Sequence, residues 1–305
     1  RLKINSATPE PLQSGIIKLK FSVEELIPFI DWTPFFLTWQ MKGKFPAILS
    51  DKKQGTEAQK LYDDALELLE IFKEKNEFEA SAVMRIFPIE KMGPDEVLVK
   101  EPGFEQMKLE FLRQQGSKGD GIPNLSLADF LHDQDYMGAF AVSSGRSYDD
   151  LALEYENDDD DYKSILVKAI ADRIAEASAE YLHYLCRTKY WGYAPEESLN
   201  NEDLIKEKYQ GIRPAPGYPA CPDHTEKSKL FELLEADKNI DITLTASYAM
   251  SPASSVSGWL LASQESKYFP IGKIEKDQVQ DYAERKGMSV DEIEKWLSPN
   301  LAYKD

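Results

Sequence analysis

The chain has 305 residues, of which 54 are Asp or Glu and 36 are Lys or Arg, so its formal net charge is -18. This acidic balance argues against a nucleic-acid partner, because a phosphate backbone is bound by clustered Lys and Arg side chains. Hydrophobic residues make up 42% of the sequence and include 14 Phe, 15 Tyr and 5 Trp, which is enough apolar material for a folded core.

Two helices are predicted in the first third of the chain. Ser22 and Glu25 have the spacing of a capping box, which predicts a short helix over residues 26–30. Residues 31–36, Asp-Trp-Thr-Pro-Phe-Phe, are expected to form a loop. Between residues 56 and 75, apolar side chains recur at three- and four-residue spacing, which is typical of an amphipathic helix.

Strands and a long helix are predicted in the middle of the chain. Residues 82–87 and 96–100 flank a Gly-Pro turn and indicate an antiparallel pair of strands. The apolar run 137–143 is too short for a buried helix and predicts a central strand. A long helix is expected from 158 to about 189, because acidic residues at its start suit the positive end of the helix dipole and an apolar stripe follows.

The last third begins with a stretch, 211–222, that is rich in Pro and Gly and can be neither a helix nor a central strand. Three strands are expected after it, over 242–250, 256–262 and 268–273. Two short helices are expected to follow, over 276–286 and 289–297. Because strands and helices do not alternate regularly, the sequence predicts an α+β fold with a largely antiparallel sheet.

The cysteines and the apolar runs indicate the environment of the protein. Cys186 and Cys221 are too few for a disulfide framework and favour a reducing, cytoplasmic location. There is no run of 18 apolar residues, so neither a transmembrane helix nor a membrane partner is expected. Residues 1–10 contain no initiating Met and no signal-peptide hydrophobic region, so we expect a segment of a longer chain.

A polar stripe on the predicted long helix is open to two interpretations. Lys168, Asp172, Glu176 and Glu180 are spaced by four residues and therefore share one helix face. One interpretation is a solvated face with a Lys168–Asp172 ion pair. The other is a polar wall of a cleft, where two carboxylates face a cationic ligand or a shared water.

Two Cys/His pairs have a local spacing that resembles zinc sites. His183 and Cys186 form one pair, and Cys221 and His224 form the other. A thiol that follows an apolar helical stripe, as Cys186 does, is usually an inert small hydrophobe. Because Cys221 lies in a stiff, Pro-bracketed loop, we expect no metal site.

Sequence motifs for other common chemistries are absent. There is no Gly-x-Ser-x-Gly elbow, and three His residues do not single out a Ser/His/Asp set. There is also no Gly-x-Gly-x-x-Gly or Walker pattern, so a Rossmann nucleotide-binding fold is not supported.

The loop 209–222 has the composition of a rigid binding loop. Three prolines stiffen it, and Gly217 permits close approach of a ligand to the main chain. Arg213 is suited to bidentate capture of a carboxylate, and Tyr218 adds a flat surface. The alternative is an ordinary connector whose Arg caps a helix end.

The region around this loop resembles a known family. Residues 209–227, Tyr-Gln-Gly-Ile-Arg-Pro-Ala-Pro-Gly-Tyr-Pro-Ala-Cys-Pro-Asp-His-Thr-Glu-Lys, are similar to the signature of the C-terminal activation domain of cobalamin-dependent methionine synthase. Further blocks agree in order, at 31–36, 51–59, 190–195, 256–259 and 285–290. The resemblance runs from about Phe21 to Tyr303. It implies a linker from a preceding module over 1–20 and an activation domain over 21–305.

The resemblance implies a fold, a ligand and a role in methionine biosynthesis. The family's domain is a C-shaped single α+β unit in which helices flank a largely antiparallel, twisted sheet. It binds S-adenosylmethionine, whose methyl group reactivates cobalamin after oxidation to the cob(II) state, with an electron commonly supplied by flavodoxin. The cobalamin-binding module of the same full-length methyltransferase is the implied partner, so this domain alone is expected to bind without turnover.

The resemblance also implies which residues contact S-adenosylmethionine: Asp31, Arg213, Ala215, Gly217, Tyr268, Phe269 and Glu176. The ligand's carboxylate would pair with Arg213, and its ammonium and sulfonium groups would face carboxylates such as Asp31. Phe269 can offer only a ring face or its backbone, whereas Tyr268 has a hydroxyl.

A second group of residues is expected to face the cobalamin. By the same resemblance these are Tyr218, His224 and Asp172, which makes His224 a cofactor-facing residue and not a zinc ligand. The segment 148–157 differs from the family pattern, and no contact is expected there. Two alternatives remain open: a stand-alone S-adenosylmethionine-dependent enzyme of this fold, and a docking module that has lost ligand binding.

Overall fold

An antiparallel sheet organises the molecule, whose computed structural model describes residues 4 and 6–303. The strands lie in the order β4-β3-β2-β5-β8, β1 also pairs with β2, and every pair is antiparallel. They are β1 (Gly15–Phe21), β2 (Ala80–Lys91), β3 (Glu96–Val99), β4 (Lys108–Glu110), β5 (Gln134–Ser143) and β8 (Ser255–Leu260). A two-stranded sheet joins β6 (Thr243–Leu244) to β7 (Met250–Ser251). The predicted α+β class is confirmed.

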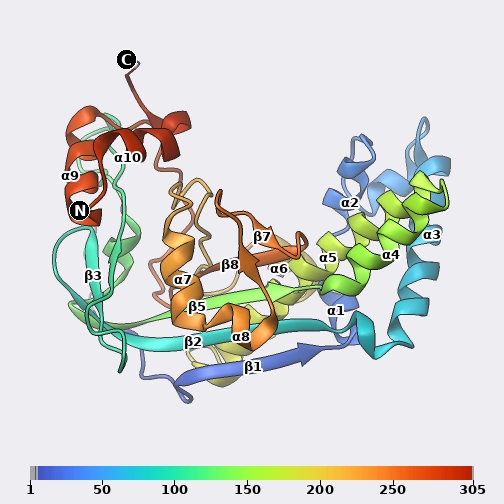
Figure 1. The fold of residues 1–305 in the computed structure, drawn as a ribbon, viewed down its shortest axis with the longest axis horizontal. Helices are drawn as coiled ribbons and strands as arrows, with labels where there is room; N and C mark the ends of the chain where they lie inside the picture. The colour runs from blue at the N-terminus through green and yellow to red at the C-terminus, as the bar shows by residue number, and fades with distance from the viewer. Residues whose placement is uncertain (1–3, 5, 304–305) are drawn as a thin grey trace.

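Helices lie on both faces and at both ends of the sheet (Figure 1). The α-helices of the described residues are α1 (Val23–Leu26), α2 (Thr33–Thr38), α3 (Gly55–Lys73), α4 (Arg146–Asn157), α5 (Asp161–Leu185), α6 (Asn201–Ile205), α7 (Glu226–Leu234), α8 (Ala236–Ile240), α9 (Lys276–Lys286) and α10 (Val290–Trp296). The long strands β2 and β5 connect a group of helices around α2, α3 and α4 with a second group at α9 and α10, which gives the expected C shape (Figure 1).

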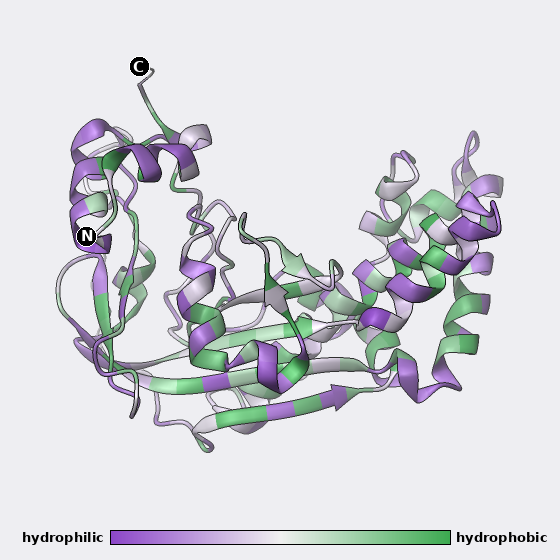
Figure 2. Ribbon diagram, in the orientation of Figure 1, coloured by the Kyte–Doolittle hydropathy of each residue, from purple (hydrophilic) through white to green (hydrophobic). Residues whose placement is uncertain are grey.

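The central strands are buried on both faces because their side chains alternate between two cores. On β2, Met84 packs into one core and Val83 into the other, and on β5 Phe140 and Ala141 divide in the same way. The first core includes the apolar side of α5, whereas the second includes that of α7. Figure 2 shows hydrophobic residues concentrated along these strands. This double burial explains why 137–143 is almost entirely apolar.

Most of the predicted helices are confirmed. The capping boxes at Ser22 and Ser289 are both present, and α3 and α5 lie where their apolar periodicity placed them. Gly287 ends α9 with a positive φ of 64°. A five-residue π-helix, Cys186–Tyr190, continues α5. Within the described residues, no helix is both long and apolar enough to cross a membrane.

Three local predictions are wrong. Residues 31–36 are not a loop throughout, because α2 begins at Thr33 with Pro34 in its first turn, where a proline is tolerated. Residues 268–273 form no strand, since the N–H of Ile271 donates to the carbonyl of Pro219, at 2.7 Å, and not to a neighbouring strand. The strand expected over 242–250 is reduced to the two residues of β6 and the first residue of β7.

Two boundaries also differ from expectation. Residues 15–20, expected in the N-terminal linker, belong to β1 and pair with β2 from Gly15 onward, so the sheet begins before residue 21. The segment 146–157, for which no helix was expected, forms α4, and the buried side chains of Tyr148 and Ala152 hold it against the first core.

A buried ion cluster joins the end of the Pro-rich loop to α9. Lys286 Nζ lies 2.7 Å from Asp223 Oδ2 and 2.5 Å from Glu226 Oε1, and all three side chains are almost fully buried. The Tyr282 hydroxyl donates to the same oxygen of Asp223 at 2.8 Å. Burial opposes the charge of Asp223, but Lys286 and Thr225 hold its pKa below the ordinary value of 3.8. The stability of the cluster therefore depends on the positive charge of Lys286, which offsets the buried carboxylates.

We expect Lys286→Met to lower the free energy of unfolding by about 3–5 kcal/mol, because it leaves the buried Asp223 without its cation and Glu226 with Lys229 alone. Asp223 contributes stability above pH ~4 that is lost as the pH falls through its lowered pKa. The difference in unfolding free energy between parent and variant should therefore be largest near neutral pH and become smaller in acid. Urea denaturation between pH 3 and 7 measures this.

The matched control is Lys238→Met, which removes a lysine from the exposed pair with Glu235. An exposed pair contributes about 0–1 kcal/mol, so this variant should remain close to the parent at every pH. If both variants lost the same free energy of unfolding, the buried Lys286 cluster would stabilise the protein no more than an exposed ion pair does.

Candidate functional site

The loop 211–222 is held in place by the edge of β8. Ile212 and Leu261 exchange backbone hydrogen bonds of 2.9 and 3.0 Å, and the N–H of Trp259 donates to the carbonyl of Pro214 at 2.9 Å. A Cβ atom at Gly258 would lie 2.9 Å from the Pro214 oxygen, so only glycine permits this approach. The sequence block 256–259 thus serves as the seat of the loop.

Two cavities lie beside the loop and share part of their walls. The first has a volume of about 530 Å³ and is lined by Arg213, Ala215, Tyr218, Tyr268 and Phe269, among others. The second has a volume of about 380 Å³ and is lined by a set that includes Asp31, Arg173 and Glu180. Glu176, Glu207 and Arg213 line both. Of the seven residues expected to contact the ligand, six therefore line one cavity or the other, and Gly217 lines neither.

Arg213 stands between the two cavities and is tied to its neighbours. Its Nη1 lies 2.9 Å from Glu180 Oε2 on α5 and donates to the Tyr209 hydroxyl at 2.9 Å. Its backbone N–H donates to the Tyr268 hydroxyl at 3.0 Å. Burial opposes the charge of Arg213, but Glu180 and the surrounding tyrosines raise its pKa above the ordinary value. The residue is a fixed cation, as capture of a carboxylate requires.

The two aromatic residues Tyr268 and Phe269 have different roles in the site. Phe269 is buried and packs edge-on against Phe130, with ring centroids 5.9 Å apart, so it offers a cavity wall. Tyr268 is partly exposed and accepts the hydrogen bond from Arg213. It thereby joins the segment 268–273 to the loop.

Asp31 reaches the second cavity from the start of α2. One of its carboxylate oxygens accepts the N–H of Thr33 at 2.9 Å, which orients the side chain. Glu176 approaches both cavities from α5. Carboxylates from two elements distant in the sequence therefore face one region.

The helix stripe is a cavity wall over only part of its length. Glu176 and Glu180 line the cavities, whereas Asp172 accepts a hydrogen bond of 2.7 Å from the Ser254 hydroxyl. Lys168 pairs with Glu156 of α4, so the Lys168–Asp172 ion pair predicted by the solvated interpretation is not formed.

The residues expected to face cobalamin come from three places: Tyr218 from the loop, His224 from the segment after it, and Asp172 from α5. Tyr218 is 61% exposed. His224 packs against Gly217, where a Cβ would lie 2.2 Å from its ring carbon Cε1, and its Nδ1 lies 3.2 Å from Lys227 Nζ. Burial and the Lys227 charge lower the pKa of His224, which favours a neutral ring at physiological pH.

Sequence reasoning missed two residues of the site. Glu207 lines both cavities, and it adopts a positive φ of 54° just before the loop. Desolvation raises its pKa, and Arg213 opposes that effect. Tyr209 is buried beside Arg213. Tyr209 begins the predicted binding loop and Glu207 lies just before it, but no pattern marked either residue as part of the site.

The two Cys/His pairs do not come together. Cys186 lies in the first core and Cys221 in the second, on opposite faces of the sheet, and both are free thiols. Burial raises the pKa of the Cys186 thiol to about 12. Within residues 4 and 6–303, no group of three or more His, Cys, Asp or Glu side chains is placed to hold a metal ion.

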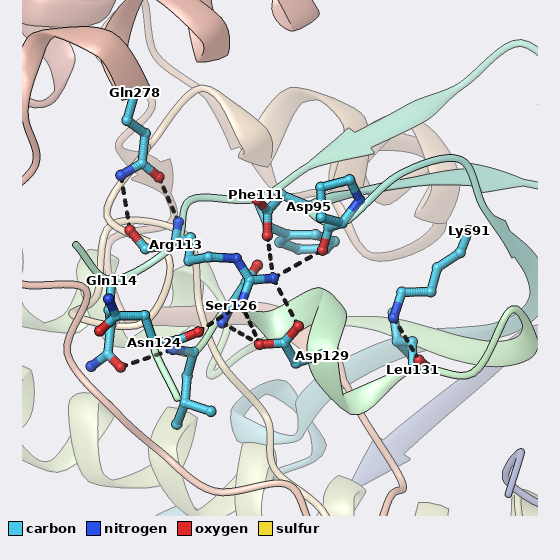
Figure 3. A network of polar contacts seen from close by, with 12 residues as sticks. Lys91, Asp95, Phe111, Arg113, Gln114, Asn124, Ser126, Asp129, Leu131 and Gln278 are labelled. Carbon is cyan, nitrogen blue, oxygen red and sulfur yellow. Dashed lines mark hydrogen bonds and ion pairs between the residues drawn. The ribbon is translucent and has the colours of Figure 1, made fainter. Parts of the chain in front are cut away.

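Another polar region, centred on Arg113, has a structural role (Figure 3). Arg113 donates to both carboxylate oxygens of Asp129, at 2.5 and 2.7 Å, and to Asp95 at 2.6 Å. Lys91 donates to the Leu131 carbonyl at 3.0 Å and lines, with Asp129, a cavity of about 780 Å³. Although this cavity is the larger, its described lining includes none of the expected ligand residues, and both terminal nitrogens of Arg113 already donate to neighbouring groups.

Comparison with known proteins points to one family. A family model described as vitamin B12 dependent methionine synthase, activation domain, matches residues 22–287. The crystal structure of the MetH reactivation domain bound to AdoHcy (S-adenosylhomocysteine) is similar to this chain, with a TM-score of 0.94 and 48% sequence identity. The match covers 98% of this chain and 94% of that chain.

We expect Gly217→Ala to destabilise the loop through two effects. The φ of +95° strains any residue with a Cβ, by about 1–2 kcal/mol. Overlap with the His224 ring adds about 1–3 kcal/mol. Urea denaturation measures the loss, and Gly272→Ala is the control, because its φ is also positive, +76°, but no atom lies within 4 Å of its Cβ position.

The added replacement His224→Ala should recover the overlap part of the Gly217→Ala loss. If Gly217→Ala cost no more than Gly272→Ala, the close packing of Gly217 on His224 would be refuted.

Proposed function

The chain belongs to the activation-domain family of vitamin B12-dependent methionine synthase, and we propose that it binds S-adenosylmethionine and supplies its methyl group for reductive methylation of cob(II)alamin. The observation that carries this proposal is the 48%-identical reactivation domain bound to AdoHcy, which matches almost the whole chain. AdoHcy is what remains of S-adenosylmethionine after its methyl group has left. The matching fold and the cavities around Arg213 support the same ligand here.

The charges beside the loop fit this ligand. S-adenosylmethionine carries a carboxylate, an ammonium and a sulfonium group. Arg213 is the guanidinium that lines both cavities, and we assign it to the carboxylate. Asp31, Glu176 and Glu207 add three carboxylates around the same space, and we assign them to the cationic groups.

The remaining lining positions the ligand. Phe269 and Ala215 give the first cavity an apolar wall, which suits the flat adenosine portion. The backbone at Gly217 has a positive φ and turns the loop where Arg213 and Ala215 line the cavities and the exposed Tyr218 borders the first of them. When bound, the ligand supplies an electrophilic methyl group, and the protein's own task is to hold and orient it.

We place the cobalamin on the outer side of the loop, against Tyr218, His224 and Asp172. The cobalamin would come from a neighbouring module of the full-length methionine synthase, and residues 1–14 would connect that module to β1. An electron donor such as flavodoxin completes the reaction in our proposal. The isolated domain would then bind its ligand without turnover, in a cytoplasmic location that agrees with two free cysteines.

We expect Arg213→Ala to weaken S-adenosylmethionine binding by about 10- to 150-fold, because a hydrogen bond to a charged group contributes about 1.5–3 kcal/mol. Titration calorimetry measures the change. Decarboxylated S-adenosylmethionine is the matched control ligand and should bind the parent and the variant almost equally. An unchanged dissociation constant for the complete ligand would remove Arg213 from the site.

We expect His224→Ala to leave ligand affinity within about twofold of the parent and to slow the reductive methylation of an added cobalamin module. Methyl transfer needs the donor sulfur, the methyl carbon and cobalt in line, so a displaced corrin lowers the rate without lowering affinity. The assay uses saturating ligand and an added reductant. A normal rate would place His224 outside the functional interface, and turnover without cobalamin would favour a stand-alone enzyme.

A further inference from the structure

The side-chain hydrogen bonds of Arg213 all run through one nitrogen. Among the described residues, its guanidinium group contacts Glu180 Oε2 and the Tyr209 hydroxyl, both at 2.9 Å and both through Nη1. A guanidinium has five N–H groups, of which Nη1 holds two. Nε and Nη2 therefore keep three N–H groups, and one from each nitrogen lies along a common edge that has the spacing of a carboxylate.

Glu180 is buried between Arg213 and a second arginine. Its side chain is 10% exposed, and its second oxygen, Oε1, lies 3.8 Å from Nη1 of the fully buried Arg187. Arg187 forms two hydrogen bonds of 2.7 Å to Glu197 and stacks on the Tyr209 ring, 4.3 Å from its centroid. The Glu180 carboxylate thus lies between two guanidinium groups, one of which is fixed by other partners.

We propose that Glu180 is a positioning residue: through Nη1 it turns Arg213 so that the Nε/Nη2 edge receives the ligand's carboxylate. This inference rests on the proposed binding of S-adenosylmethionine. Tyr209 assists by accepting the other N–H of Nη1, and the charge of Arg187, which Glu197 holds in place, attracts the second oxygen of Glu180. Selectivity for a carboxylate-bearing ligand therefore depends on a residue that does not itself contact the carboxylate.

A simpler role for Glu180 would be competition with the ligand for Arg213. The geometry argues against it, because Glu180 uses only Nη1 and leaves the bidentate edge open. The two roles predict opposite signs. Loss of a competitor would strengthen ligand binding, whereas loss of a positioning residue would weaken it.

The test is the ratio of affinities for S-adenosylmethionine and its decarboxylated form, measured by calorimetry on the 305-residue chain. Glu180→Gln keeps the size of the side chain and removes its charge. We expect about tenfold weaker binding of the complete ligand, and less than about threefold change for the decarboxylated ligand. Equal weakening of both ligands, or stronger binding of the complete ligand, would overturn the proposal.

The matched control is Glu197→Gln, which removes a carboxylate from the same buried cluster but does not contact Arg213. We expect it to lower the thermal stability while leaving the affinity ratio unchanged. A change of ratio as large as that of Glu180→Gln would reduce Glu180 to a general structural role.

A milder replacement keeps the proposal testable if Glu180→Gln does not fold. Tyr209→Phe removes the second acceptor of Nη1 together with the hydroxyl contact between Tyr209 and Tyr268, and it retains the stacking on Arg187. It should lower the affinity ratio by about threefold, and an unchanged ratio would overturn the proposal. If the parent chain binds neither ligand, the proposed function is refuted. If the parent binds both ligands but the variants do not show the expected affinity ratios, only the proposed role of Glu180 is refuted.

Discussion

The close approach of the loop 212–214 to β8 is the constraint on which the site depends. β8 is the last strand of the sheet, and the loop takes up hydrogen bonds of its outer edge through Ile212 and Pro214. An uncovered edge would present unpaired backbone groups, so the loop satisfies the sheet while the sheet fixes the loop. Gly258 makes this possible, because any side chain there would push the Pro214 carbonyl away.

With the loop seated, the chemistry of the site follows from which side chains can face it. The long helix α5 brings Glu176 and Glu180 to the cavities, and the start of α2 brings Asp31. Against these carboxylates, Arg213 is the cation that lines both cavities. A molecule with two positive groups and one carboxylate matches this distribution, whereas a phosphate-rich molecule would meet a wall of negative charge.

The sequence predicted local elements of the fold better than contacts between distant segments. Local patterns located α3, α5, the two capping boxes and the rigid loop, because each depends on neighbouring residues. Long-range contacts were not visible. α2 was missed because Pro34 was interpreted as a break, although its helix is stabilised by the packing of Trp32 on Tyr62, with centroids 4.9 Å apart. The Glu180–Arg213 pair likewise joins residues that no local pattern connects.

The two sides of the loop are anchored by separate buried ion clusters. Arg213 is tied to Glu180 and, through it, to Arg187, beside Cys186 in the first core. The segment after the loop is tied through Asp223 to Lys286, beside Cys221 in the second core. Because these cores lie on opposite faces of the sheet, a disturbance of one cluster need not reach the other. Gly217 lies between the two halves, at the point where the loop passes from one cluster to the other.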